Sequence, residues 1–214
     1  NQEKYISEAI KSVLSQKVTF DFEIIVYDDC SNDQTSNIIE DFLKKYPQTI
    51  FSIRAQENKF SKGIRPYPIA HKYCKGKFIA HCDGDDFWND DFKLQKQVEL
   101  LQINKSYSAC VTNGLIMHEN QNSSSEILFQ NTNKKFFTLD DLMDGNPFLS
   151  CTAMYRKSFL KKNYEVIKSL NVGDYPLYIL AAQNGNIGYI KDITATYRIH
   201  TSGDWQGQND IDSL

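Results

Sequence analysis

The stretch from residue 77 to residue 88, KFIAHCDGDDFW, constrains this chain more than any other. It opens with the apolar run Phe78–Ala80, which is typical of a strand buried on both faces. Three carboxylates follow within four residues, at Asp83, Asp85 and Asp86. Open α/β sheets bind ligands at the carboxyl ends of their strands, so this stretch predicts a strand that ends in a binding site.

The motif Asp83-Gly84-Asp85 is suited to holding a divalent cation. Residues i and i+2 of an extended chain point the same way, so the two carboxylates can share one target, and Gly84 lets that target approach closely. Hard oxygen ligands of this kind hold Mg²⁺ or Mn²⁺ together with substrate phosphates. The alternative is a polar loop that caps the following helix, but a cap needs only one carboxylate, and three repel one another.

A second acidic strand end comes earlier in the chain. Residues 22–27 are predicted to form a buried strand, and Asp28 and Asp29 follow it directly. Strands and helices alternate through this half, which indicates βαβ units and a mostly parallel sheet. Both acidic strand ends then lie at one edge of the sheet and form a single site. Helix capping accounts for the polar residues 31–35, but not for the aspartate pair.

Composition limits the class of protein. The 214 residues are enough for one α/β domain, and 41% of them are hydrophobic, which is ordinary for a globular chain. A net charge of −3 gives no electrostatic footprint for nucleic acid, so no nucleic-acid partner is expected. Five scattered cysteines without a Cys-x-x-Cys motif favour a reducing compartment over a zinc site or a disulfide framework. No apolar run has membrane-spanning length, and no signal peptide is visible.

Two candidate residues have a plain structural alternative. Arg65 lies in a polar loop at 56–68, and its planar cation suits a phosphate or a base, although a solvated loop is an equally good interpretation. Asp174 stands at the start of a predicted helix with Pro176 in its first turn, where spacing alone favours a capping role.

The second half of the chain is less regular. Residues 119–135 are rich in polar side chains and predict an exposed loop. Near the end, residues 187–190 and 193–199 predict two closing strands arranged as a hairpin.

Several stretches, taken in order, resemble one family. They are the amphipathic helix at residues 1–16, the acidic strand ends at 23–35 and 83–88, and the run at 74–80 that leads into the second of these ends. A motif at 93–97 and a late Arg-x-His at 197–200 complete the set. Their order and spacing resemble the family 2 glycosyltransferases over nearly the whole chain. The resemblance implies an α/β fold of the GT-A (Rossmann-like) type, with a mostly parallel sheet flanked by helices and a short acceptor-side region near the C-terminus. It also implies one domain at 1–214, with a nucleotide-sugar-binding half at 1–117 and an acceptor-binding and catalytic-base half at 136–214.

The resemblance assigns roles to particular residues. The second aspartate of the Asp28-Asp29 pair binds the nucleotide base, the Asp-x-Asp motif holds the metal with Asp83 nearer the ribose, and Asp174 is the catalytic base. The candidate nucleotide-sugar contacts are Asp28, Asp29, Arg65, Asp83, Gly84 and Arg198. The candidate ligands of Mn²⁺ or Mg²⁺ are Asp83, Asp85 and His200.

The chain departs from the family pattern in three places. The family's first strand is absent, and Asn1 resembles its last residue, so a trimmed domain is expected. Gly63-Ile-Arg-Pro66 replaces the more usual Ala-Arg-Asn, so Arg65 is not carried over by a matching motif. Gly173 stands where a glutamate commonly precedes the catalytic aspartate.

The function implied is an inverting, metal-dependent transfer of a hexosyl or hexosaminyl group. The donor is a nucleotide-diphosphate sugar, with a UDP-sugar expected first, and the acceptor is a glycan or glycolipid in polysaccharide or glycoconjugate synthesis. The expected location is the cytoplasm, with peripheral association at the inner face of the membrane. Two alternatives stay open: a sugar-phosphate nucleotidyltransferase and a catalytically inactive nucleotide-sugar-binding module. A haloacid-dehalogenase-type phosphatase is disfavoured because Phe87 occupies the position that would need Thr or Val.

Overall fold

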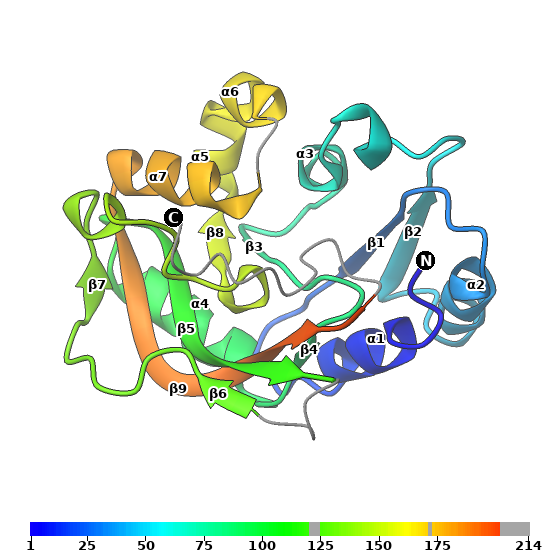
Figure 1. Ribbon diagram of the computed structural model, residues 1–214, viewed down its shortest axis with the longest axis horizontal. Coiled ribbons are helices and arrows are strands. Elements are labelled where there is room, and N and C mark those ends of the chain that lie inside the picture. Colours follow the sequence, from blue (N-terminus) through cyan, green and yellow to red (C-terminus); the bar gives the residue numbers. More distant parts are fainter. Residues whose placement is uncertain (120–124, 171–172, 202–214) are drawn as a thin grey trace.

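The computed structural model describes residues 1–119, 125–170 and 173–201. Parts of the predicted loop at 119–135 and of the acceptor-side half at 136–214 therefore lie outside the described residues. Within them the chain forms an α/β structure with two sheets flanked by helices (Figure 1). This confirms the α/β class predicted from the alternation of apolar strands and amphipathic helices.

The first sheet is a parallel pair near the N-terminus. Its strands are β1 (Ile24–Asp28) and β2 (Ile50–Arg54), joined through helix α2 (Thr35–Lys45), and helix α1 (Ile6–Leu14) precedes them. The register runs from Ile24 opposite Ile50 to Asp28 opposite Arg54. One apolar cluster, Ile6, Ile10, Ile39 and Ile50, holds α1 and α2 to this sheet.

The second sheet carries the rest of the strands, in the order β3-β8-β5-β9-β4, with β6 on β5 and β7 on β9. Their bounds are β3 (Phe78–Ala80), β4 (Phe87–Trp88), β5 (Tyr107–His118), β6 (Ser125–Ile127), β7 (Phe136–Phe137), β8 (Met154–Arg156) and β9 (Asn186–Ile199).

The prediction of a mostly parallel sheet was wrong. Among the described strands only β1–β2 and β5–β9 pair in parallel, and the other five pairings are antiparallel. A parallel pair needs a long crossover, usually a helix, whereas a short connection such as that from β5 to β6 returns the chain in the opposite direction. The helix–strand alternation that suggested parallel pairing is a property of the first half of the chain.

The predicted closing hairpin is a single long strand. β9 runs unbroken from residue 186 to residue 199 beside β5, but its register jumps where Thr112 faces Ile190 and Asn113 faces Ile193. Lys191 and Asp192 are therefore extra residues on β9, so the polar break in the sequence marks an irregularity in the strand and not a turn. Asp192 forms an ion pair with Lys96 of helix α4 (Lys93–Ile103) at 2.6 Å, which ties the irregularity to that helix.

The remaining helices pack on the second sheet. They are α3 (Pro66–His71), α4 (Lys93–Ile103), α5 (Lys157–Lys162), α6 (Tyr164–Ser169) and α7 (Asp174–Asn184), with 3₁₀ turns at Phe60–Lys62, Asp140–Leu142 and Ser150–Thr152. Figure 1 shows α5, α6 and α7 gathered on one side of the β5–β9 pair. Tyr155, Tyr178 and Ile187 lie fully buried in the core there. Among the described helices, none combines the length and apolar character needed to cross a membrane.

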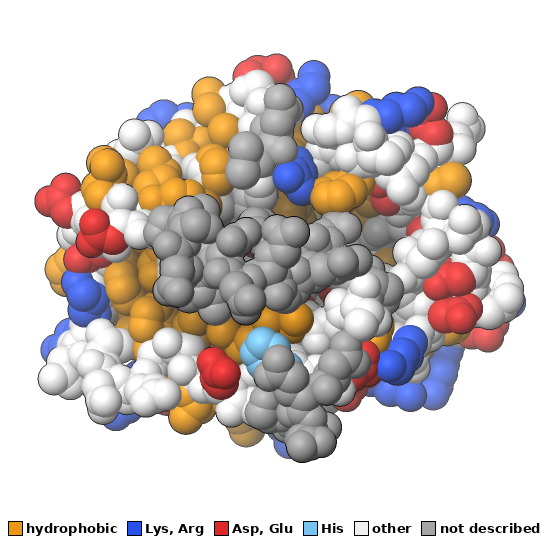
Figure 2. All heavy atoms as spheres, viewed as in Figure 1, with side chains coloured by type: hydrophobic (Ala, Val, Ile, Leu, Met, Phe, Trp, Pro, Cys, Tyr) orange, Lys and Arg blue, Asp and Glu red, His pale blue; other side chains and the backbone are white. Residues whose placement is uncertain are grey.

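Charges of both signs are spread over the face seen in Figure 2, with hydrophobic side chains gathered over the part where Figure 1 shows α7. This face therefore shows no large patch of a single charge sign, in keeping with the small net charge of −3.

Arg156 joins β8 to the end of α4. Its Nε donates to the Tyr107 carbonyl at 2.6 Å, and one terminal nitrogen donates to the carbonyls of Asn104, at 2.9 Å, and Leu101. Because these carbonyls lie at the C-terminal end of α4 and the turn to β5, the guanidinium satisfies groups that the helix cannot.

We expect Arg156→Ala to lower the free energy of unfolding by about 2–3 kcal/mol, since charge-assisted hydrogen bonds contribute about 1.5–3 kcal/mol and this side chain is half-buried. Urea denaturation measures the change. The exposed Lys161→Ala, on the neighbouring helix, is the control and should stay within about 0.5 kcal/mol of the parent. An Arg156→Ala protein as stable as the Lys161→Ala protein would contradict this role.

Candidate active site

Asp28, at the end of β1, is a buried anchor for the turn that follows. Its carboxylate accepts hydrogen bonds from the Ser31 amide at 2.9 Å and from the Ser36 hydroxyl, and Arg54 Nε lies 3.7 Å away. Burial alone would raise the pKa of Asp28, but the hydrogen bonds from Ser31 and Ser36 outweigh it, so the pKa is lowered. Asp28 therefore shapes the loop beside the site, which includes Cys30 at a φ of 67°.

Asp29 links the end of β1 to the loop at 56–68. One of its oxygens accepts the Lys59 amide at 2.9 Å, and the other accepts the Phe60 amide at 2.7 Å. The half-buried carboxylate is thus a fixed acceptor at the carboxyl edge of the first sheet. Its predicted contact with a nucleotide base stays a prediction.

Asp85 and His200, both candidate metal ligands, lie in contact. His200 Nε2 lies 3.1 Å from Asp85 Oδ2, and the same oxygen accepts a hydrogen bond from Gln2 Nε2 at 3.0 Å. The imidazole is buried and packs on the Tyr5 ring, with centroids 4.5 Å apart, while the Asp85 side chain keeps 20% of its surface exposed. The Asp85 carboxylate is thus partly open to solvent, and the buried imidazole contacts it.

Asp83 is held by two hydroxyl groups. Tyr67 OH donates to one carboxylate oxygen at 2.5 Å, and Ser150 Oγ donates to the other at 2.7 Å. The Tyr67 ring stacks on His81 with centroids 4.0 Å apart, and His81 Nε2 lies 2.7 Å from His71 Nε2. Burial lowers the pKa of His71 to about 4 and lowers that of His81 as well, so this support is a neutral pair in which one ring donates to the other.

Asp86 lies on the inner side of the turn. Only 1% of its surface is exposed, and it accepts the Arg198 amide at 2.9 Å. Burial, and then the carboxylates of Asp83 and Asp85, raise its pKa well above the usual range. The third carboxylate of the motif is therefore a structural group that tolerates protonation. Asp83 and Asp85 are the two carboxylates of the motif that could bind a ligand.

Arg198 and Gly84 have contacts of their own within the protein, and their predicted contacts with the donor stay predictions. The Arg198 guanidinium does not join the acidic cluster: it donates to Glu8 at 2.6 Å and lies over the rings of Tyr5 and Phe87. A Cβ on Gly84 would lie 3.3 Å from side-chain atoms of Gln2 and Ile6, so the packing there leaves little room for a side chain.

Asp174 begins α7 and lies close enough to the acidic turn to be affected by it. Burial raises the pKa of this half-buried carboxyl group to about 7, the Asp83 carboxylate adds to the rise, and the positive charge of Arg65 opposes it. Arg65 itself stacks over Phe60 at 4.8 Å. Four predicted residues thus belong to one neighbourhood, with Asp83 and Asp85 on the turn and Asp174 and Arg65 beside them.

Sequence reasoning missed three residues that contact this cluster: Gln2, Tyr67 and Ser150. Each is a single polar residue outside any motif, and Ser150 is 67 positions from the aspartate it contacts. The only available signal was the position of Gln2 and Tyr67 in segments already assigned to the site region.

The cluster is not a complete metal centre by itself. Among the described residues, no group of three or more His, Cys, Asp and Glu side chains is gathered in an arrangement that could hold a metal ion. A cation here would need oxygen ligands from a bound substrate, which is how Mg²⁺ is commonly held.

Comparison with known proteins connects this geometry to a family. The family model for glycosyl transferase family 2 matches residues 1–163. An uncharacterised protein of Mycobacterium tuberculosis is 30% identical over 208 residues, covering 96% of this chain and 58% of the relative, so the chain spans little more than half of that relative's length.

Solved structures agree. Residues 1–349 of Staphylococcus aureus TarS in complex with UDP superpose with a TM-score of 0.68 at 25% identity, covering 93% of this chain and 58% of that one. TarS is named a poly(ribitol-phosphate) β-N-acetylglucosaminyltransferase. A Pyrobaculum calidifontis mannosyltransferase in complex with GDP-Man and Mn²⁺ shares the fold at 15% identity, with a TM-score of 0.66 and coverage of 92% of this chain and 54% of its own. The chain has the GT-A fold and belongs to glycosyltransferase family 2.

Proposed function

We propose that this chain transfers a hexosyl or hexosaminyl group, with inversion, from a nucleotide-diphosphate sugar to a hydroxyl group of a glycan or glycolipid. The observation that carries the proposal is the placement of Asp174, with a pKa near 7, next to the Asp83–Asp85 turn. A base that accepts a proton near neutral pH thus lies beside carboxylates suited to a metal-bound diphosphate. The UDP bound to TarS favours a UDP-sugar as donor, in polysaccharide synthesis.

Asp83, Asp85 and His200 would hold the Mn²⁺ or Mg²⁺. Asp85 and His200 lie 3.1 Å apart, and the Asp83 carboxylate retains lone pairs beyond the two hydroxyl groups that it accepts. Their chemistry suits such an ion, and phosphate oxygens of the bound donor would complete the set of ligands that these three side chains leave incomplete. When bound, such a cation neutralises charge that develops on the leaving diphosphate. Mn²⁺ in the Pyrobaculum calidifontis enzyme supports this choice of ion.

The protein's own groups then bind, orient and remove a proton. Asp174 accepts the proton of the acceptor hydroxyl, whose oxygen attacks the face of the sugar opposite the diphosphate and so inverts the anomeric centre. Asp28 and Asp29 shape and contact the nucleotide pocket, and Arg65 balances charge beside Asp174. Gly84 contributes its backbone, and Arg198 would reach the donor only by leaving Glu8.

The two halves of the domain divide this work. Residues 1–117 supply both acidic strand ends and most of the donor site, to which His200 contributes from the other half. Residues 136–214 supply Asp174 and meet the acceptor. We place the reaction on the cytoplasmic side, with peripheral association at the inner face of the membrane.

The test is turnover of a panel of nucleotide sugars with Mn²⁺ and with a chelator. We expect one UDP-sugar to be hydrolysed slowly in the presence of the metal, with release of UDP, and the chelator to stop this. A folded protein that binds a donor but never turns it over would favour the inactive binding module. Formation of a nucleotide sugar from a sugar phosphate and a nucleoside triphosphate would favour the nucleotidyltransferase.

The hydroxyl of Tyr67 positions Asp83, so Tyr67→Phe should raise the KM for the donor about tenfold with a smaller change in kcat, as is typical when a group that orients a ligating residue is lost. Ser150 still holds the other oxygen, which limits the effect. Tyr73→Phe, in the turn that follows α3 and more exposed, is the control and should not change KM. Equal donor kinetics for the two variants would contradict the positioning role.

A further inference from the structure

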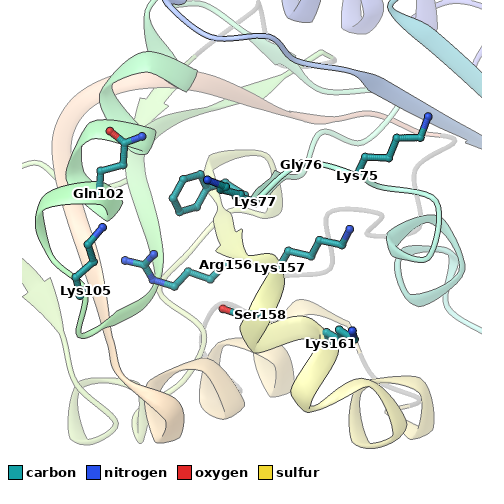
Figure 3. Close-up of a pocket in the computed structure, with 10 residues that line it drawn as sticks. Lys75, Gly76, Lys77, Gln102, Lys105, Arg156, Lys157, Ser158 and Lys161 are labelled. Atoms are coloured by element: carbon teal, nitrogen blue, oxygen red, sulfur yellow. The ribbon is translucent and has the colours of Figure 1, made fainter.

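A basic groove lies away from the acidic cluster. A cavity of about 740 Å³ is lined by Lys75 and Lys77 before β3, Lys105 after α4, Arg156 at the end of β8, and Lys157 and Lys161 on α5. Figure 3 shows that these side chains come from three segments that are far apart in the sequence. Six cationic side chains around one hollow contrast with the mixed charges of the face in Figure 2.

The five lysines of this groove are available to a ligand. In residues 1–119, 125–170 and 173–201, none of them forms an ion pair with a carboxylate. Glu23 lies beside the groove, but its carboxylate accepts the backbone amides of Lys75 and Gly76. Arg156 is committed to three carbonyls, so it contributes positive charge without a free hydrogen-bond fork.

The groove lies at the edge of the sheet opposite the acidic cluster. Lys77 precedes β3, whose other end leads into the turn with Asp83, and Arg156 pairs with Phe78 at the start of that strand. Three strand residues span about 10 Å. The diphosphate of a donor bound at the acidic turn therefore does not occupy this groove. The cationic side chains of the groove are available to a different anion.

We propose that the groove binds a chain of phosphodiester-linked units, the body of an anionic acceptor polymer whose end reaches Asp174. The inference rests on the proposed transferase function and specifies its acceptor class. The groove is open and receives cations from three separate segments, so the repeated negative charges of a chain laid along it would complement its lysines. A long polymer can extend from the groove around the sheet to Asp174, whereas acceptors anchored in a membrane docked on this edge would stay on the side of the sheet away from Asp83.

Direct binding of fluorescently labelled inorganic polyphosphate, followed by anisotropy without any donor, tests the groove. Lys157→Glu combined with Lys161→Glu should weaken binding about tenfold, and raising the salt concentration should weaken binding to the parent protein steeply, as counterion release predicts. Lys44→Glu combined with Lys45→Glu on α2 changes the net charge equally and should leave binding within about twofold. Equal losses in the two double variants would overturn the proposal.

Two further measurements separate the groove from its alternatives and from the transferase function. Sedimentation with phosphatidylglycerol vesicles that is lost in the groove variant, without polyphosphate binding by the parent, would assign the surface to a membrane and overturn the proposal. Donor hydrolysis should be unchanged in the groove variant, because its lysines lie away from the acidic turn. Polyphosphate binding by a protein that turns over no donor would retain the groove and refute the transferase function.

Discussion

Asp174→Asn is expected to lower kcat for transfer about 10²–10⁴-fold, the usual contribution of a positioned general base. The substitution keeps the size of the side chain at the start of α7 but removes the group that accepts the proton of the acceptor. Donor affinity should be unchanged, because the side chain meets the acceptor and not the nucleotide. Release of the nucleoside diphosphate gives kcat, and calorimetry gives the dissociation constant of the donor.

The control for this substitution is Asp140→Asn, an exposed aspartate on the 3₁₀ turn at Asp140–Leu142. It should transfer at the parental rate. Full transfer activity in the Asp174→Asn protein would mean that another residue is the base.

The raised pKa of Asp174 predicts two linked effects of pH. Activity should rise as pH increases through about 7, because only the carboxylate accepts a proton, and Asp174→Asn should lose this rise.

The stability of the folded protein should change with pH in the opposite direction. A carboxyl group whose pKa is raised by folding binds more protons folded than unfolded between pH 4 and 7, so its contribution to stability is lost as pH increases over that interval. Removing the charge should therefore make the variant's unfolding less sensitive to pH than the parent's.

The acidic turn gives the second large effect. Asp85→Asn should lower metal-dependent turnover about a thousandfold, because stabilisation of charge by a bound cation contributes several kcal/mol to catalysis. The residual activity should no longer respond to a chelator. Transfer kinetics measured with and without Mn²⁺ provide the comparison.

Asp41→Asn on α2 is the control, since that side chain is 79% exposed and far from the turn in the sequence. It should keep both the parental rate and the full response to chelator. If Asp85→Asn retained parental activity with the same dependence on Mn²⁺, the metal would be bound elsewhere.

Much of this site could be predicted from the sequence because its parts are local. An apolar run followed by carboxylates identifies the end of a strand: β3 ends at Ala80 as that pattern predicts, and β1 ends at Asp28, one residue later than predicted. The contact between Asp85 and His200, 115 positions apart, followed from resemblance to the family and not from the residues themselves.

What could not be predicted depends on packing between distant segments. Nothing near Ser150 or Tyr67 shows that their hydroxyl groups reach Asp83, and nothing near Glu8 shows that it holds Arg198. The polar pair Lys191-Asp192 resembles a turn, but β9 stays extended because its register against β5 accommodates both residues. Strand direction was misjudged for the same reason, since pairing partners such as β3 and β8 lie some 75 residues apart.

The most direct test of the site is a crystal of this protein grown with UDP and Mn²⁺, measured at a wavelength where manganese scatters anomalously. We expect one anomalous peak within coordination distance of Asp85 and His200, with the diphosphate of UDP on its other side. A manganese peak or a UDP molecule bound at any other place, with Asp85 and His200 contacting neither, would contradict the assignment of this cluster as the donor site.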